Sequence, residues 1–190
     1  MASATSELRI TIPDWVDECV ATFQGALADE QAQMQLAIAL SRENVARGGG
    51  PFGAIVIAGD AVVAAGVNRV LDSRLSIAHA EIVALMRAQI ALAGSAPGTH
   101  EPLALVTSTE PCCQCFGAIV WSGIARLVCG ALKEDAEAIG FDEGPKPSDW
   151  ALELERRGIS VRQALGREQA RAVLADYQRL GGPIYGLRSP

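Results

Sequence analysis

The sequence lacks a basic segment, a long apolar run and a targeting signal, and each absence excludes a class of protein. The net charge is −6 and no Lys/Arg cluster accompanies it, which argues against a nucleic-acid partner, because such partners normally require a basic face. No run approaches the ~20 apolar residues of a membrane-spanning helix. The opening residues have neither the basic start nor the apolar stretch of a secretory signal. We therefore predict a cytoplasmic protein that acts on small molecules.

Cysteine is also scarce, with five residues in the chain. An odd count does not suit a disulfide framework, and in a reducing compartment clustered cysteines are more often ligands or catalysts than disulfides. Three of the five nevertheless fall within four positions, in the stretch EPCCQC at 110–115. A disulfide, a redox pair, a metal site and a buried apolar cluster are all possible uses of these thiols.

The rest of the composition is typical of one globular α/β domain. The 190 residues, 49% of them hydrophobic and 20% charged, suffice to bury a core. Two short apolar runs about Gly59-Asp60 predict a β-hairpin. Periodicity predicts helices at 14–28, 30–47, 79–94, 112–122, 133–138 and 167–180, and a further helix that ends at 157. It predicts strands at 54–58, 61–67, 103–107, 126–130 and 159–162. This alternation predicts a three-layer α/β/α sandwich with a mixed central sheet.

Two of the clustered cysteines lie on one face of a predicted helix. Pro111 suits the first helical turn, and the three-residue spacing of Cys112 and Cys115 makes their side chains converge. A helix N-terminus lowers the pKa of a thiol and so favours thiolate, the form that binds metal. Taken alone, such a pair fits a redox dithiol, a structural zinc site or chance.

The chain has only two histidines, His79 and His100. A single histidine at a helix start is more often a capping or packing residue than a ligand, but Glu81 follows His79 in the pattern His-Ala-Glu. His-x-Glu at one helix start and Pro-Cys-x-x-Cys at the next are the signature of the zinc-dependent deaminases. We therefore predict one Zn²⁺ per chain, held by His79, Cys112 and Cys115.

Three protein ligands predict a catalytic zinc, because a structural ion is usually closed by four ligands and a catalytic one keeps a position for water. Such an ion acidifies the water and presents hydroxide to an electrophilic carbon. Glu81 is predicted to take the water's proton, give it to a ring nitrogen and later protonate the departing amine. The expected reaction is hydrolytic deamination with release of ammonia.

Over most of residues 30–190 the chain resembles the cytidine deaminase-like superfamily and, within it, the bacterial guanine deaminases. The resemblance implies a cytidine deaminase-like fold, with a single deaminase domain over 29–190 that includes a C-terminal lid segment, after an N-terminal helical extension at 1–28. It also implies a homodimer and the conversion of guanine to xanthine and ammonia. Deamination of an aminotriazine, pterin, cytosine or nucleoside stays open, as do a tRNA adenosine deaminase, a structural zinc module and a redox dithiol.

The same resemblance implies the residues around the substrate. Phe52 in GGGPFGA and Asn68 in GVNRV match an aromatic and an amide position, one suited to stacking on a purine and one to reading its edge. Glu143 matches a second acid that shares the proton transfer with Glu81. The predicted substrate contacts are Phe52, Asn68, Ala80, Trp121, Asp142 and Tyr185, the last as part of the lid. Core packing is the alternative for Phe52 and Trp121, and a turn for Asn68.

Overall fold

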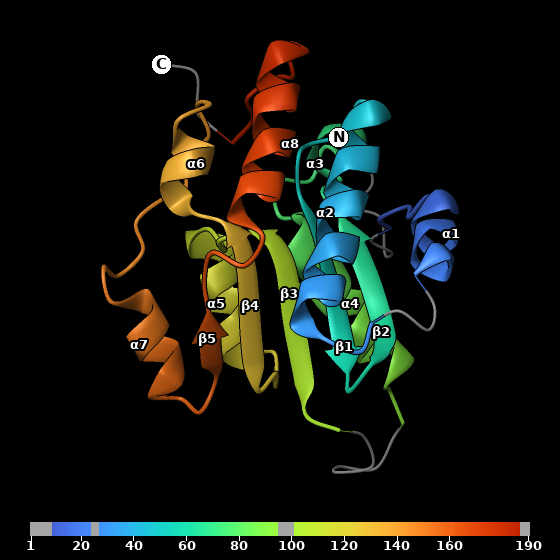
Figure 1. The fold of residues 1–190 in the computed structure, drawn as a ribbon, viewed down its shortest axis with the longest axis vertical. Coiled ribbons are helices and arrows are strands. Elements are labelled where there is room, and N and C mark those ends of the chain that lie inside the picture. The colour runs from blue at the N-terminus through green and yellow to red at the C-terminus, as the bar shows by residue number, and fades with distance from the viewer. Residues whose placement is uncertain (1–8, 24–26, 95–100, 187–190) are drawn as a thin grey trace, which may run out of the picture.

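A five-stranded sheet lies between two layers of helices (Figure 1). The computed structural model describes residues 9–23, 27–94 and 101–186. The helices are α1 (Trp15–Thr22), α2 (Glu30–Ala46), α3 (Val70–Ser73), α4 (Ala80–Ala91), α5 (Cys113–Trp121), α6 (Lys133–Glu137), α7 (Trp150–Glu155) and α8 (Arg167–Arg179). The strands are β1 (Gly53–Ala58), β2 (Ala61–Val67), β3 (Leu103–Thr109), β4 (Arg126–Ala131) and β5 (Ser160–Arg162). The predicted α/β/α sandwich with a mixed sheet is confirmed.

The strand directions determine where a site can form. The strand order is β2-β1-β3-β4-β5. β1 is antiparallel to both of its neighbours, whereas β3, β4 and β5 are parallel to one another. Strands β2 to β5 therefore all end at the edge of the sheet where β1 begins. Ligand sites of α/β sheets lie at such carboxyl ends.

The sheet is buried on both faces. Along β1, Ile55 and Ile57 pack in the cluster that includes α2 and α8, while Ala54 and Val56 pack in the cluster that includes α4, α5 and α7. All four side chains are fully buried. A strand covered on both faces reads as an unbroken apolar run rather than an alternating one, and this is why 54–58 could be recognised as a strand.

Several predicted elements differ from the structure in their bounds. The first helix ends at Thr22, whereas the prediction extended it to residue 28. The connection from 68 to 77, for which no helix was predicted, contains the short helix α3, which begins where the Asn68 Oδ1 accepts a hydrogen bond from the Val70 N–H at 3.1 Å. Strand β3 continues to Thr109, beyond the predicted end at 107, because Thr109 still pairs with Ala131 of β4.

Helix α1 packs against the same core as the rest of the chain. The side chain of Val16 is fully buried in the cluster that contains α2. Arg87 of α4 donates to both carboxylate oxygens of Asp17 at 2.9 Å and to the carbonyl of Ala65 in β2 at 2.8 Å. These contacts connect α1 to the edge of the sheet. The division of the chain at residue 28 stays a prediction.

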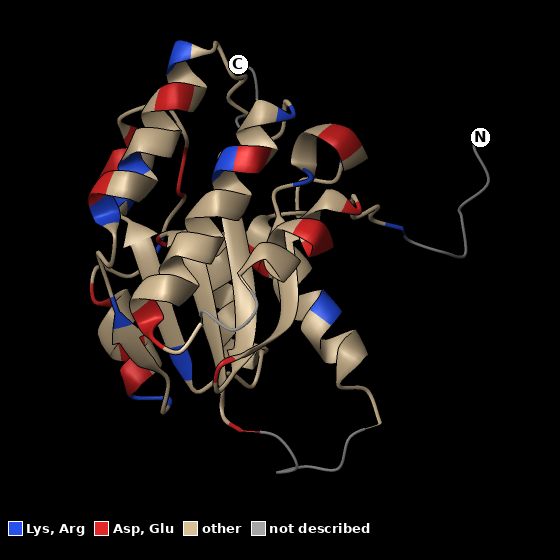
Figure 2. Cartoon of the chain, turned by 45° about the vertical axis from the view of Figure 1, so that its right-hand side comes forward, with Lys and Arg blue, Asp and Glu red and all other residues tan. Residues whose placement is uncertain are grey.

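Charged side chains are mixed over the outer helices. Lys and Arg alternate with Asp and Glu along the helical layers in Figure 2. Exposed pairs of this kind, such as Arg47 with Glu43 at 2.7 Å, contribute little to stability because both partners are well solvated. Among the described residues, no helix combines the length and the apolar character that crossing a bilayer requires.

Candidate functional site

Two helices begin next to each other at the carboxyl edge of the sheet. His79 is the N-cap of α4 and Cys112 is the N-cap of α5, and both have extended backbone angles. An N-cap side chain usually accepts a hydrogen bond from the first helical turn, but neither of these side chains does so. They turn toward each other instead. Pro111 lies before the N-cap rather than in the first helical turn, which corrects its predicted place.

The structure brings the three predicted metal ligands together. The Nδ1 of His79 lies 3.4 Å from the Sγ of Cys112 and 3.5 Å from the Sγ of Cys115. In a tetrahedral site with Zn–S of ~2.3 Å and Zn–N of ~2.0–2.1 Å, nitrogen and sulfur are about 3.6 Å apart. The donors also have the right chemistry, since thiolate and imidazole both suit zinc. Within the described parts of the chain this group has no fourth member.

The pKa values of the two cysteine thiols are shifted in opposite directions. A hydrogen bond from the Cys115 thiol, together with the contact to His79, lowers the pKa of Cys112 to about 4. The pKa of Cys115 is raised well above its usual value, because it donates that hydrogen bond and is buried. A lowered thiol pKa favours the thiolate, which is the form that binds metal.

Glu81 is the second residue of α4, and its carboxyl group lines a cavity beside the metal ligands. Its side chain is 6% exposed. Burial raises the pKa of Glu81, and the negative charge of Cys112 raises it further. A carboxyl group whose pKa is shifted toward neutrality is suited to acid–base work.

Glu143 faces the same cavity from the loop between α6 and α7. Burial, followed by the charges of Cys112 and Glu81, raises the pKa of Glu143 to about 8. The cavity is lined by Phe52, His79, Glu81, Glu110, Cys112, Phe141, Asp142, Glu143, Tyr185 and Gly186. The two predicted proton carriers therefore share one cavity with two of the metal ligands.

Three aromatic side chains, those of Phe52, Phe141 and Tyr185, line the cavity. The Phe141 ring lies edge to face with those of Phe52 and Tyr185, each with centroids 5.0 Å apart. The hydroxyl of Tyr177 donates to the carbonyl of Pro183 at 2.6 Å and so holds the segment that carries Tyr185. A Cβ at Gly50 would lie 1.9 Å from the Tyr185 hydroxyl, so this packing requires glycine at position 50.

Asn68 ends β2 at the same edge of the sheet and is 1% exposed. Its Oδ1 accepts from the Val70 N–H, so the turn proposed as its alternative role is present. Its Nδ2 is buried and has no partner among the described residues, and the same is true of the Tyr185 hydroxyl. Both side chains pack beside Gly50. Buried polar atoms without partners are rare; Tyr185 lines the cavity, whereas Asn68 does not.

Three predicted substrate contacts, Asn68, Ala80 and Trp121, are not among the residues that line the cavity. Ala80 is fully buried in the core cluster of α4, where its carbonyl oxygen lies close to Gly66. Trp121 is the last residue of α5 and is 86% exposed. Six helical residues separate it from Cys115, which is about 9 Å along the axis. The structure therefore places Trp121 away from the metal ligands, on the opposite end of their helix.

Three residues that line the cavity were not among the predicted site residues: Glu110, Phe141 and Gly186. Glu110 stands at the start of the stretch EPCCQC, and Phe141 precedes Asp142 in the loop GFDEG. A glutamate before the proline of the cysteine motif was the available signal for Glu110. For Phe141 there was none, because an aromatic residue beside a glycine is most often a packing residue.

Comparison with known proteins places the chain among the deaminases. The family model described as the cytidine and deoxycytidylate deaminase zinc-binding region matches residues 27–131. The guanine deaminase of Bacillus subtilis (strain 168) is 37% identical over 113 residues, which are 58% of this chain and 69% of that protein. The structure of a guanine deaminase from Nitrosomonas europaea has a TM-score of 0.85 and 41% identity, covering 94% of this chain and all of that one. A variant of the protein NE0047 in complex with 8-azaguanine has the same TM-score and coverage, at 42% identity.

Proposed function

The chain belongs to the cytidine and deoxycytidylate deaminase zinc-binding family, and on that premise we propose that it hydrolyses guanine to xanthine and ammonia. Zinc deaminases are hydrolases that act on C–N bonds, and the family's ligand set of one histidine and two cysteines is present as His79, Cys112 and Cys115. The observation that carries the proposal is the meeting of these ligands with Glu81 and Glu143 at one cavity.

Glu81 and Glu143 would divide the proton transfers between them. Zinc held by one imidazole and two thiolates would activate a water molecule for attack on the carbon that bears the amine. The Glu81 carboxylate accepts the proton from that water and delivers it to a ring nitrogen, which makes the carbon more electrophilic. Glu143, which faces the same cavity, protonates the departing amine and regains a proton from the hydroxyl group on the attacked carbon as the carbonyl forms. Both side chains are nearly buried, which limits the contact of these carboxyl groups with bulk water.

The cavity suits a planar ring that has hydrogen-bond acceptors. Phe52 and Phe141 offer aromatic faces and edges, which pack well on a purine. Asn68 does not itself line the cavity, but its side chain packs beside Gly50 and its Nδ2 is a donor with no partner among the described residues. Guanine presents acceptors at N7 and O6. The family match covers residues 27–131. The likeness to the guanine deaminase structure covers 94% of the chain, so it also includes the segments after residue 131 that would contact the base.

The direct test is ammonia release from a panel of amines by the purified zinc form. The panel contains guanine, guanosine, adenine, cytosine, cytidine, a pterin and an aminotriazine. We expect guanine to have the highest kcat/KM. Turnover of another amine with guanine inert would contradict the substrate assignment and leave the chemistry intact. Inactivity toward every amine would contradict both.

Replacement of Asn68 by Ala is expected to lower kcat/KM for guanine by about 10- to 100-fold, because it leaves an acceptor of the bound base without a partner. Asn68→Asp is the matched variant, since it keeps the oxygen that accepts from the Val70 N–H and removes only the donor. Steady-state kinetics and melting temperatures of both variants provide the check. Full activity of Asn68→Asp would exclude the amide nitrogen as a substrate contact.

The proposal includes a homodimer. Helices α4 and α5 cover the same face of the sheet, and three large apolar side chains on or next to them are exposed: Trp121 at 86%, Ile90 at 72% and Ile77 at 53%. Large apolar side chains exposed on one face of a protein are typical of protein–protein contacts. This role would also account for Trp121, which does not reach the cavity.

Trp121→Glu is therefore expected to convert a dimer into a monomer, because it places a charge in an apolar interface. Light scattering after size-exclusion chromatography measures the mass. Leu180→Glu is the control, since Leu180 is also exposed, at 62%, but follows α8 on the other face of the sheet. A wild-type chain that elutes as a monomer would contradict the assignment.

A further inference from the structure

The loop that carries Glu143 has no regular secondary structure. It runs from Gly140 to Asp149, between α6 and α7, and contains no helix or strand. Its residue 143 must nevertheless keep a fixed distance from the metal ligands if it is to transfer protons, because catalytic geometry tolerates little displacement. The contacts that hold this loop therefore decide whether Glu143 can act.

A buried lysine connects the loop to the metal motif. The Nζ of Lys146 donates to Glu110 Oε1 at 2.5 Å and to the carbonyl of Pro111 at 2.6 Å. It also lies 4.3 Å from the centroid of the Trp150 ring. The side chain of Lys146 is 2% exposed and that of Glu110 is 7% exposed. Glu110 and Pro111 directly precede the ligand Cys112, so Lys146 holds the loop against the residues that position this ligand.

A second contact fixes the loop at Glu143 itself. The Cys113 N–H donates to the carbonyl of Glu143 at 2.9 Å. At Gly144, which has a φ of +67°, a Cβ would lie 2.4 Å from the Cys113 sulfur, so the loop approaches α5 as closely as glycine allows. The two attachments are only three residues apart, and together they leave the Glu143 side chain little freedom.

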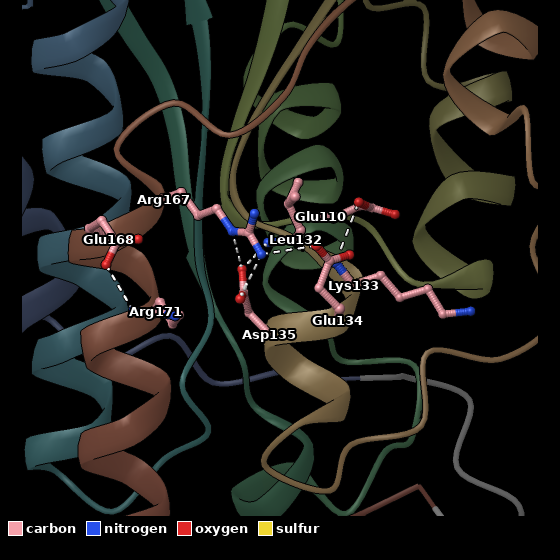
Figure 3. A network of polar contacts seen from close by, with 8 residues as sticks. All are labelled: Glu110, Leu132, Lys133, Glu134, Asp135, Arg167, Glu168 and Arg171. Carbon is pink, nitrogen blue, oxygen red and sulfur yellow. Dashed lines mark hydrogen bonds and ion pairs between the residues drawn. The ribbon is translucent and has the colours of Figure 1, made fainter.

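Glu110 is the point where three segments of the chain meet. Its Oε2 accepts from the N–H of Lys133, the first residue of α6, at 3.4 Å (Figure 3). The same figure shows Arg167 of α8 on the carboxylate of Asp135, which also accepts from the Leu132 N–H at 2.8 Å. The end of β3, the start of α6 and the loop that carries Glu143 are thus joined through one buried carboxylate.

Stability alone does not account for a buried ion pair. Two charges taken out of water lose hydration that their attraction only partly replaces, and apolar pairs of similar volume are often equally stable. What a buried lysine with several directed contacts does provide is a fixed geometry. The chain contains one other lysine, Lys133, whose side chain is 37% exposed and pairs with Glu137 on the surface. It offers a matched comparison.

We propose that Lys146 is a positioning residue for the deamination: through Glu110 and Pro111 it holds the loop from Gly140 to Asp149 so that Glu143 faces the cavity beside Cys112. Lys146 itself does not line the cavity. The inference rests on the proposed function, because it assigns Lys146 a role in the proton transfers that Glu143 performs there.

The test is a double-mutant cycle between Lys146→Met and Glu143→Gln, run with the amine that the wild-type chain deaminates best. Lys146→Met is expected to lower kcat by about 10²-fold, with a smaller change in KM and with zinc still bound. In the Glu143→Gln background the same change should cost about 2-fold or less, because its effect passes through Glu143. Equal losses in both backgrounds would overturn the proposal.

An activity-independent measurement accompanies the cycle. In Lys146→Met the amide of Cys113 should exchange with solvent about 10-fold faster or more, since its acceptor, the Glu143 carbonyl, is released. Unchanged protection would overturn the proposal, as would loss of zinc from this variant. Lys133→Met is the control and should keep wild-type rates and exchange.

The variant Glu110→Gln/Lys146→Met removes both buried charges and remains the test if Lys146→Met alone does not fold. It should fold, bind zinc and still show the fall in kcat; wild-type kcat in this variant would exclude a positioning role. The substrate assignment and the role of Lys146 can be contradicted independently of each other. Inert guanine with another active amine contradicts only the substrate, whereas an additive cycle contradicts only the role of Lys146.

Discussion

Replacing Glu81 with Gln is expected to reduce turnover by about 10⁴-fold while the protein keeps its zinc, because the change removes a proton carrier and no metal ligand. The amide has nearly the same shape and can keep hydrogen bonds at the start of α4, but it cannot accept the proton of the attacking water. Glu81 is 6% exposed, so no solvent carboxylate can take its place. Ammonia release and the metal content of the purified variant are the two measurements.

The split between the two measurements is what distinguishes catalysis from structure. If Glu81 had only a structural role, Glu81→Gln would keep both its zinc and its activity, or would lose both. Glu155→Gln is a suitable control, since Glu155 is exposed at the end of α7 and lies outside the cavity; it should retain full activity. If Glu81→Gln turned over substrate within about 10-fold of wild type, the proton transfers would have to be assigned to another group, with Glu143 as the next candidate.

The second large effect is expected from the metal ligands. Cys115→Ser should lose zinc together with measurable ammonia release, because serine is a poor ligand for zinc at neutral pH and no replacement lies in the described part of the site. Stability should fall as well. A cation present at 1,000 times its Kd stabilises the folded chain by about 4 kcal/mol, and this contribution disappears with the site.

A comparison of the wild-type chain with Cys115→Ser in the presence of a chelator tests whether the loss of stability comes from the loss of zinc. A chelator should lower the melting temperature of the wild-type chain and leave that of Cys115→Ser unchanged, because the variant has no ion to lose. Cys113→Ser is the matched control: Cys113 lies between the two ligands in sequence but does not belong to the ligand group, so this variant should retain zinc. Stoichiometric zinc in Cys115→Ser would contradict the ligand assignment.

The metal ligands could be predicted from the sequence because their geometry is local. Cys112 and Cys115 come together through a three-residue helical spacing, and His79 through a second helix start at the same edge of the sheet. The hairpin and most helices were predictable for a similar reason, since each depends on the periodicity of a short segment. Only the approach of the two helix starts to each other is a long-range contact. Periodicity does not predict it, but the combination of His-x-Glu with Pro-Cys-x-x-Cys does, because it is the signature of a zinc site.

The walls of the cavity were harder to predict because they depend on packing between distant segments. Trp121 matched a pattern, but the direction and length of α5 carry it away from the ligands. Phe141 and Lys146 lie in an irregular loop, where no periodicity indicates which side chains turn inward. Their roles follow from partners at Phe52 and Glu110, some 90 and 36 positions away along the chain.

The strand directions have a consequence for how such a protein can be altered. The reactive centre occupies two adjacent helix starts, whereas the groups that would surround the heterocycle belong to separate connections: the turn before β1, the end of β2, the loop after α6 and the segment after α8. The turn before β1, the end of β2 and the segment after α8 can be exchanged without altering the pair of helix starts, whereas the loop after α6 must keep Glu143 and its contacts with Cys113 and Glu110. A library confined to those three stretches is therefore a rational starting point for redirecting the enzyme to a different aminated heterocycle.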